Sequence, residues 1–189
     1  MSQTPPGSDD YFLRVIENFR ALRELAPAIE QAAQMLASTI RQGRKIMFCG
    51  NGGSAADSQH LAAELVGRYL KERNPLPGLA LTVDTSALTA IANDYSYAEV
   101  FARQLRGLGQ KGDALVALST SGNSENVLRA VQAAKAMGIS TIGLTGQGGG
   151  KLREACDVAI CAPATEANHI QEMHIAIGHY LCGVIERDA

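Results

Sequence analysis

The sequence predicts an α/β fold, with a five-stranded parallel sheet covered by helices on both faces. Short apolar runs repeatedly end in glycine- or serine-rich turns that lead into helical patterns, which is typical of β–α units. The composition agrees, because 46% of the residues are apolar but only 5% are aromatic, whereas an all-β sandwich is richer in aromatic residues. A length of 189 residues suits one domain, so we assign residues 1–189 to a single domain.

The chain is predicted to begin with a helical extension over about residues 9–42. Apolar side chains recur there at helical spacing, with Phe12, Ile16 and Phe19 on one face. Pro27 marks either a kink or the first turn of a second helix, and Gly43 is a natural stop.

Strands and helices alternate in the rest of the chain. The first unit is a strand at 45–49 and a glycine turn at 50–53, followed by a helix whose Ser54 and Asp57 suggest a variant capping box. The other predicted elements are strands at 79–82, 113–118, 140–144 and 158–161, a helix at 125–137 capped by Gly138, and a final helix at about 166–187. If the strand order is 2-1-3-4-5, as in flavodoxin-like sheets, the loops after the first and third strands border one crevice.

Charge and cysteine usage exclude several classes of protein. Seventeen Lys and Arg residues against nineteen Asp and Glu give a net charge of −2, and basic residues form no run, so nucleic acid is not an expected partner. The apolar runs are shorter than the roughly 18 residues of a membrane helix, and residues 1–10 lack a signal-peptide pattern. The four cysteines are scattered as in a reducing compartment, so we expect a cytoplasmic protein without a membrane partner.

The segment from Ser119 to Ser124 has the features of a phosphate cradle. It supplies four hydroxyl groups and the flexible Gly122 directly before a predicted helix, whose unpaired N–H groups and dipole favour an anion. The alternative is an elaborate helix cap, although a cap needs only one serine.

The glycine turn allows a second interpretation. Residues 50–55 fit the loose dinucleotide pattern G-x-G-x-x-A. The acidic residue expected about twenty positions on would be Asp84, which lies about thirty positions on, and a nicotinamide site gives no role to the histidines described next. We therefore regard this match as weak.

Titratable side chains gather in two helical segments. His60 and Glu64 are four residues apart, so they share a helix face and can bind a divalent metal, or Glu64 can be a base; the alternative is an ordinary surface pair. Gln171 and His179 are eight residues apart, about 80° around a helix, so both can face one site. His169 and His174 then point elsewhere, which indicates structural roles.

Several motifs together resemble those of the sugar isomerase (SIS) domain and, within it, the bacterial phosphoheptose isomerases. The resemblance extends over nearly the full length. The matching segments are Cys49-Gly50-Asn51-Gly52-Gly53-Ser54, Gln59-His60 through Glu64, Gly67-Arg68-Tyr69, Ala90-Ile91-Ala92-Asn93-Asp94-Tyr95, Ser119-Thr120-Ser121-Gly122-Asn123-Ser124, Leu144-Thr145-Gly146, and Ile170-Gln171-Glu172 with His179.

The resemblance implies an aldose–ketose isomerase that converts sedoheptulose 7-phosphate to D-glycero-D-manno-heptose 7-phosphate, the first step of nucleotide-activated heptose synthesis. It also implies a homotetramer with one Zn²⁺ per subunit. The implied metal ligands are His60, Glu64, Gln171 and His179. The implied substrate contacts are Asn51, Gly52, Gly53, Glu64, Asn93, Asp94, Ser119, Thr120, Ser121, Ser124 and Gln171, with Arg68 as a further anion contact.

By the same resemblance Glu64 is the catalytic base, and His179 assists ring opening or oxygen protonation. The sequence departs from the family pattern at His169, where relatives commonly have arginine before Ile-Gln-Glu. This departure concerns a local ion pair or a subunit contact rather than a metal or substrate contact.

Three other functions remain as alternatives. A related SIS protein is a non-catalytic tetramer that binds the replication initiator without keeping the full ligand set, so the presence of His60, Glu64, Gln171 and His179 favours the isomerase. An amino-sugar isomerase or etherase on the same fold fits less well with the short chain and its long N-terminal helices. The nicotinamide dehydrogenase is the weakest alternative.

Overall fold

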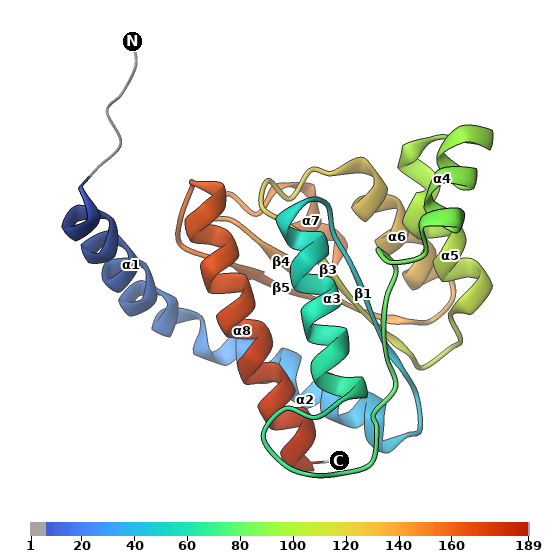
Figure 1. The fold of residues 1–189 in the computed structure, drawn as a ribbon, viewed down its shortest axis with the longest axis horizontal. Helices are drawn as coiled ribbons and strands as arrows, with labels where there is room; N and C mark the ends of the chain where they lie inside the picture. The colour runs from blue at the N-terminus through green and yellow to red at the C-terminus, as the bar shows by residue number, and fades with distance from the viewer. Residues whose placement is uncertain (1–6, 189) are drawn as a thin grey trace.

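The computed structural model describes residues 7–188 and confirms the predicted α/β architecture (Figure 1). In chain order the elements are α1 (Ser8–Leu22), η1 (Arg23–Leu25), α2 (Ala26–Arg41), β1 (Ile46–Cys49), α3 (Gly53–Val66), β2 (Gly78–Ala80), α4 (Thr85–Asp94), η2 (Tyr97–Glu99), α5 (Val100–Leu108), β3 (Ala114–Ser119), α6 (Glu125–Ala136), β4 (Ser140–Thr145), α7 (Gly150–Ala155), β5 (Val158–Cys161) and α8 (Ala167–Asp188). Residues 1–6 and 189 of the predicted domain lie outside the described residues.

The five strands form one parallel sheet in the predicted order β2-β1-β3-β4-β5. Ile46 of β1 pairs with Gly78 of β2 on one side and with Ala114 of β3 on the other. After β2 the chain therefore crosses back over β1, so that β3 lies on the opposite side of β1 from β2. The loops that leave these two strands lie at the switch point, where α/β sheets bind their ligands.

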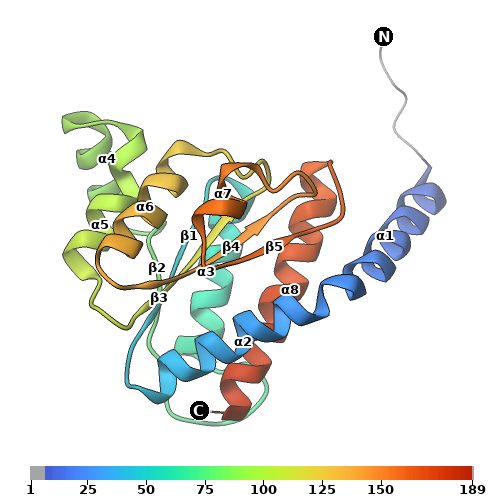
Figure 2. The ribbon, with the colours of Figure 1, turned by 180° about the vertical axis from the view of Figure 1, so that it is seen from behind.

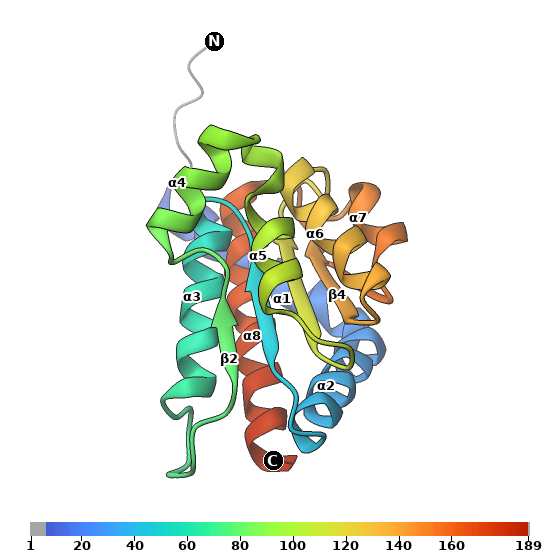
Figure 3. The same ribbon diagram turned by 90° about the vertical axis from the view of Figure 1, so that its right-hand side faces the viewer.

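Alternate side chains of each strand pack into two separate cores. Ile46 and Phe48 of β1 join the core beneath α2, α3 and α8, whereas Met47 and Cys49 join the core beneath α5, α6 and α7. Figure 3 shows the sheet from its β2 edge, with helices on either side. Burial on both faces explains why the strands are continuous apolar runs in the sequence. No helix within residues 7–188 has the length and apolar character needed to cross a membrane.

The predicted N-terminal extension is two helices joined by the short turn η1. Pro27 is the second residue of α2, so it belongs to the first turn of a second helix. α2 packs on α8, while α1 continues outward from the body (Figure 2). Near the start of α1, the hydroxyl of Tyr11 bonds to Glu172 of α8, and its ring lies 4.9 Å from that of His169.

Helices α3 and α8 lie side by side and run in the same direction (Figure 1). Glycines make this packing close. A Cβ atom added to Gly53 would lie 2.6 Å from the side-chain amide of Gln171, and one added to Gly178 would lie 2.4 Å from a methyl group of Leu61. A larger residue at either position would therefore force the facing side chain or the helix to move.

The predicted capping box at Ser54 and Asp57 is wrong. Helix α3 begins at Gly53, and its N-cap is Gly52, which has a φ of 56° and no side-chain capping bond. The left-handed turn at Gly52 starts the helix early and places Ser54 inside its first turn. The Oδ2 atom of Asp57 is buried without a hydrogen-bond partner among the described residues, and this burial raises the pKa of the carboxyl group.

His169 and His174 have structural surroundings, as predicted. His169 Nδ1 lies 2.9 Å from Glu172 Oε2, so the position where relatives carry arginine holds a local pair within α8. His174 is fully buried, and its Nε2–H donates to the Thr145 carbonyl at 3.1 Å. Burial lowers the pKa of His174 to about 4.

We predict that the buried neutral His174 makes the fold acid-sensitive. The unfolded chain takes up the proton near the ordinary pKa of 6.5, whereas the folded chain takes it up only near pH 4. The free energy of unfolding should therefore fall by about 3 kcal/mol as the pH drops between these values. Urea unfolding across this pH range measures the loss. His174→Gln, which keeps a donor but does not titrate, should show a pH dependence smaller by this amount, and equal pH dependence in both proteins would contradict the prediction.

Candidate active site

The loop between β3 and α6, residues 119–124, lies at the C-terminal edge of the sheet and turns sharply at Gly122. Gly122 has a φ of 66°, and a Cβ atom there would lie 2.1 Å from the Gly149 carbonyl oxygen. Its own N–H donates to the Ser119 carbonyl at 2.9 Å. This serine loop therefore requires glycine at position 122 both for its backbone angle and for its contact with the following loop.

The hydroxyl groups of the serine loop face one another in front of α6. Ser119 Oγ lies 3.0 Å from Ser124 Oγ and 3.5 Å from Ser121 Oγ. Ser124 occupies the N-cap position of α6 but makes no side-chain capping bond. Ser124 itself therefore does not cap the helix through its side chain, as the helix-cap alternative would require. Hydroxyl groups beside a helix N-terminus without a side-chain cap are suited to a phosphate group.

The turn after β1 forms the other side of the crevice. A Cβ atom at Gly50 would lie 3.0 Å from the Leu118 carbonyl oxygen, so this turn passes close to the end of β3, which leads into the serine loop. The side-chain amides of Asn51 and Asn126 exchange two hydrogen bonds of 2.9 and 2.8 Å across this gap. The amide pair holds Asn51, a predicted substrate contact, against the first turn of α6, and the predicted contacts Gly52 and Gly53 follow it.

Asn93 and Asp94, two further predicted substrate contacts, are the last residues of α4. Both are exposed, and Asn93 Nδ2 donates to Asp94 Oδ1 at 2.8 Å. Tyr97, just beyond them, donates its hydroxyl to Asn51 Oδ1 at 3.1 Å, which ties this segment to the β1 turn.

The sequence interpretation missed Asn126 and Tyr97. An asparagine in the first turn after the serine loop was a signal for Asn126. The sequence holds no comparable signal for Tyr97.

His60 and Glu64 of α3 and His179 of α8 form a cluster with metal-ligand chemistry. The Nε2 atoms of the two histidines are 2.9 Å apart, and His60 Nε2 lies 3.1 Å from Glu64 Oε1. One ligand atom from each residue lies within 4.8 Å of the others. Ligands of a tetrahedral Zn²⁺ with bonds of about 2.0–2.1 Å lie about 3.3 Å apart, so small side-chain shifts make room for the ion. Two imidazoles and a carboxylate fit zinc.

Gln171, the fourth predicted ligand, lies elsewhere in this arrangement. Its side-chain amide packs against Gly53 at the start of α3. His60 is seven residues further along α3, or about 10 Å along the helix axis. The structure thus gathers three of the four predicted ligands and places Gln171 beside a predicted substrate contact.

Known proteins resemble this chain in sequence. The family model described as SIS domain matches residues 10–146. A phosphoheptose isomerase of Rhodospirillum rubrum is 61% identical over 168 residues, which is 89% of each chain. The chain belongs to the phosphoheptose isomerase family. Another member of this family, from Akkermansia muciniphila, is 56% identical over 176 residues, or 93% of each chain.

Solved structures of the phosphoheptose isomerase family agree with the fold. The structure of phosphoheptose isomerase GmhA from Neisseria gonorrhoeae superposes with a TM-score of 0.90 at 43% identity, covering 95% of this chain and 96% of that one. Membership of the phosphoheptose isomerase family removes the nicotinamide dehydrogenase as an alternative. It also favours an isomerase over the non-catalytic tetramer.

Within one chain, Arg68 lies far from the serine loop. It follows the C-terminal end of α3, whereas the serine loop lies near the N-terminal end of α3, about 20 Å away along the helix. Its guanidinium Nε lies 3.9 Å from Glu72 Oε2, and both side chains are exposed. A role for Arg68 as an anion contact stays a prediction.

Proposed function

We propose that this chain interconverts sedoheptulose 7-phosphate and D-glycero-D-manno-heptose 7-phosphate, the first step toward nucleotide-activated heptose. The proposal rests on one observation: a member of the phosphoheptose isomerase family combines a phosphate-type serine loop with the His60–Glu64–His179 cluster. An aldose–ketose isomerase needs both parts, because it must hold the phosphate of its substrate while it moves a proton between two carbons.

The serine loop would hold the 7-phosphate with neutral donors. Ser119, Ser121 and Ser124 offer hydroxyl groups, and the N-terminus of α6 offers N–H groups and the positive end of its dipole. Because these donors are neutral, the site needs no basic cluster, which agrees with a net charge of −2.

Glu64 and His179 would move the protons. From the ketose, the Glu64 carboxylate takes a proton from C1 and returns it to C2, so the intermediate is an enediol. His179 gives a proton to the oxygen on C2 and accepts one from the hydroxyl on C1, which completes the exchange. The His179 Nε2 atom points at His60 Nε2 across 2.9 Å, so its reactive nitrogen lies on the side of the cluster that carries Glu64.

We include one Zn²⁺ per subunit in this proposal. His60, Glu64 and His179 would hold it, with Gln171 as the predicted fourth ligand. Glu64 and His179 would transfer protons only when released from the ion, because a lone pair bound to a metal cannot take up a proton. When bound, zinc supplies Lewis-acid stabilisation of the charge that develops on the substrate oxygens.

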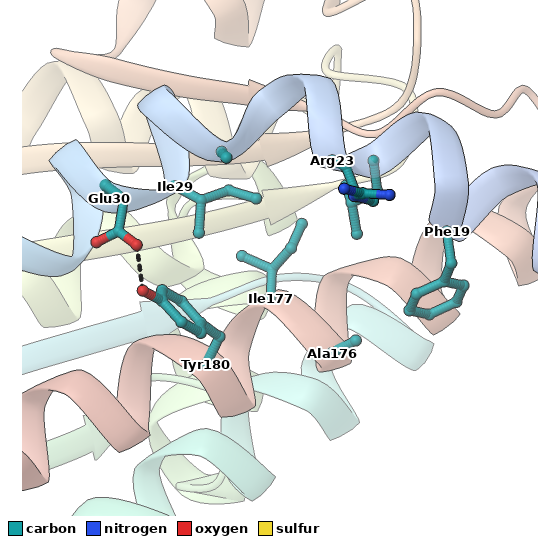
Figure 4. A pocket seen from close by; sticks show the side chains of 9 residues that line it. Phe19, Arg23, Ile29, Glu30, Ala176, Ile177 and Tyr180 are labelled. Atoms are coloured by element: carbon teal, nitrogen blue, oxygen red, sulfur yellow. Dashed lines mark hydrogen bonds between the residues drawn. The ribbon is translucent and has the colours of Figure 1, made fainter.

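We also propose a homotetramer in the cytoplasm. Phe12 and Ile16 of α1 are 61% and 47% exposed and share one helix face. A groove of about 380 Å³ between α2 and α8 continues this surface; Figure 4 shows Ile177 and Tyr180 in it, with the Tyr180 hydroxyl bonded to Glu30. Exposed apolar surface of this kind marks an interface, and further copies of the chain would cover it. The cysteines are free thiols whose pKa values burial raises, which suits a reducing compartment.

We predict that purified protein isomerises sedoheptulose 7-phosphate and that Glu64→Gln lowers kcat by about 10²–10⁴-fold, because the amide cannot take the proton. His179→Ala should cause a loss of similar size. A coupled assay for the aldose product measures both, and Glu154→Gln, an exposed change on α7, should retain full activity. A wild-type protein without isomerase activity would refute the function. Full activity in both site variants would refute the site.

Metal analysis tests the zinc proposal independently of catalysis. Elemental analysis should find one zinc per chain, and a chelator should remove it together with the activity. His60→Ala should weaken zinc binding by at least about tenfold in a chelator competition, because it removes one of three gathered ligands. Protein that contains no zinc and responds neither to zinc nor to chelator would contradict this assignment.

The oligomeric state is measured by light scattering. We expect a mass four times that of the 20.0 kDa chain. Placing a charge on the exposed face of α1 with Ile16→Glu should lower this mass, because a buried charge without a partner is costly. Leu108→Glu, a similar change at an exposed position on α5, serves as the control. A monomeric wild type, or a tetramer unaffected by Ile16→Glu, would contradict the proposed interface.

A further inference from the structure

The loop that follows α3, residues 67–73, is held to the end of α8 by a single carboxylate. Glu186 of α8 has a side chain only 3% exposed, and it accepts the backbone N–H groups of Tyr69, Leu70 and Lys71 at 3.0, 2.9 and 2.9 Å. Three successive N–H groups on one buried carboxylate fix the course of this loop.

Arg73 links the same carboxylate to α3. Its Nε–H donates to Glu186 Oε1 at 3.1 Å, and its Nη2–H donates to the backbone carbonyl of Glu64 at 2.8 Å. The Arg73 side chain is 12% exposed, so the ion pair is largely shielded from water. The Arg73–Glu186 pair therefore joins the loop, α8 and the turn of α3 that carries Glu64 into one unit.

Tyr69 is the residue of this loop that reaches the candidate active site. Its ring stacks on the imidazole of His179, with centroids 5.7 Å apart and planes inclined by 16°. Another neighbour of His179 is the ring of His60, whose centroid is 5.0 Å away. Gly183 of α8 lies beside the tyrosine, since a Cβ atom there would be in van der Waals contact with the Tyr69 ring at 3.4 Å. The imidazole is thus bordered by two rings.

We propose that Tyr69 is a positioning residue for His179, and that the Arg73–Glu186 pair acts by holding Tyr69 in place. An imidazole that exchanges protons or binds a metal through Nε2 must keep this atom directed at its partner. The stacked ring of Tyr69 limits rotation of the imidazole. The planar face supplies this effect, so phenylalanine can replace tyrosine. The kinetic consequence rests on the proposed isomerase function.

The test compares Tyr69→Leu with Tyr69→Phe. With sedoheptulose 7-phosphate, Tyr69→Leu should lower kcat by at least about tenfold, because misplacement by about 1 Å costs up to about 10²-fold, while KM stays within about twofold because the serine loop is unchanged. Tyr69→Phe should retain kcat within about twofold. Leu70→Ala, in the same loop at a side chain 71% exposed, should behave as the wild type. Full kcat in Tyr69→Leu, or equal losses in the Phe and Leu variants, would overturn the proposal.

Two further measurements separate this proposal from the proposed function. Zinc affinity, measured by chelator competition, should fall about tenfold in Tyr69→Leu and remain in Tyr69→Phe. The NMR signal of the His179 Cε1–H should carry a ring-current shift that is kept in Tyr69→Phe and lost in Tyr69→Leu. If the wild type does not isomerise but both patterns appear, the function fails and the positioning role stands. If the wild type isomerises and neither pattern appears, the positioning role fails alone. Tyr69→Met replaces the Leu variant if that protein does not fold.

Discussion

The close packing of α3 against α8 is the constraint on which the candidate active site depends. The two helices are far apart in the sequence, and His60 and His179 meet where Gly178 lets α8 approach Leu61. A larger residue at position 178 would force either the Leu61 side chain or α8 to move, since a Cβ atom would already lie 2.4 Å from Leu61. Apolar packing at Leu61 and the Arg73–Glu186 pair thus act together on the geometry of the cluster.

The sheet supplies the second half of the site through its strand order. Because β1 and β3 are neighbours, the turn at Gly52 and the serine loop face each other, and the Asn51–Asn126 amide pair joins them. Helix α3 takes part in both halves. Its N-terminus borders the serine loop, and the His60–Glu64 face lies about two turns along. Helix α3 would thus fix the distance between the substrate phosphate near its N-terminus and the proton transfer further along it.

The sequence predicted what depends on local pattern. The apolar runs, the serine loop and the i,i+4 pair His60–Glu64 follow from short-range spacing, and the structure has them where they were expected. Other features depend on contacts between distant segments, which periodicity does not encode. They are the packing of Gln171 against Gly53, the Tyr69–His179 stack and the hydrogen bonds from the loop at residues 67–73 to Glu186. The predicted capping box was wrong because a serine near a glycine turn can lie either at the N-cap or inside the first turn of the helix. The left-handed Gly52 is the N-cap, so Ser54 lies inside the first turn. Helix α4 was not predicted from the sequence, although Leu88, Ile91 and Ala92 form a half-buried apolar face that packs against the core beneath α5, α6 and α7.

Charged side chains of this protein pair with one another within the fold, and the proposed phosphate site uses neutral donors. Several of its basic side chains are engaged in structural pairs, such as Lys45 with the buried Asp113 at 2.6 Å and Arg73 with Glu186. Arg129 and Arg106 both bond to Glu99 and so lower its pKa. In the proposed function, anion recognition would fall to hydroxyl groups and to the N-termini of α3 and α6, whose N-cap residues make no side-chain capping bond. Such donors are fixed by the backbone, so a phosphate held there is located by the same sheet and helices that locate Glu64 and His179. A flexible lysine would bind the anion equally well but would not fix its distance from the reacting carbons.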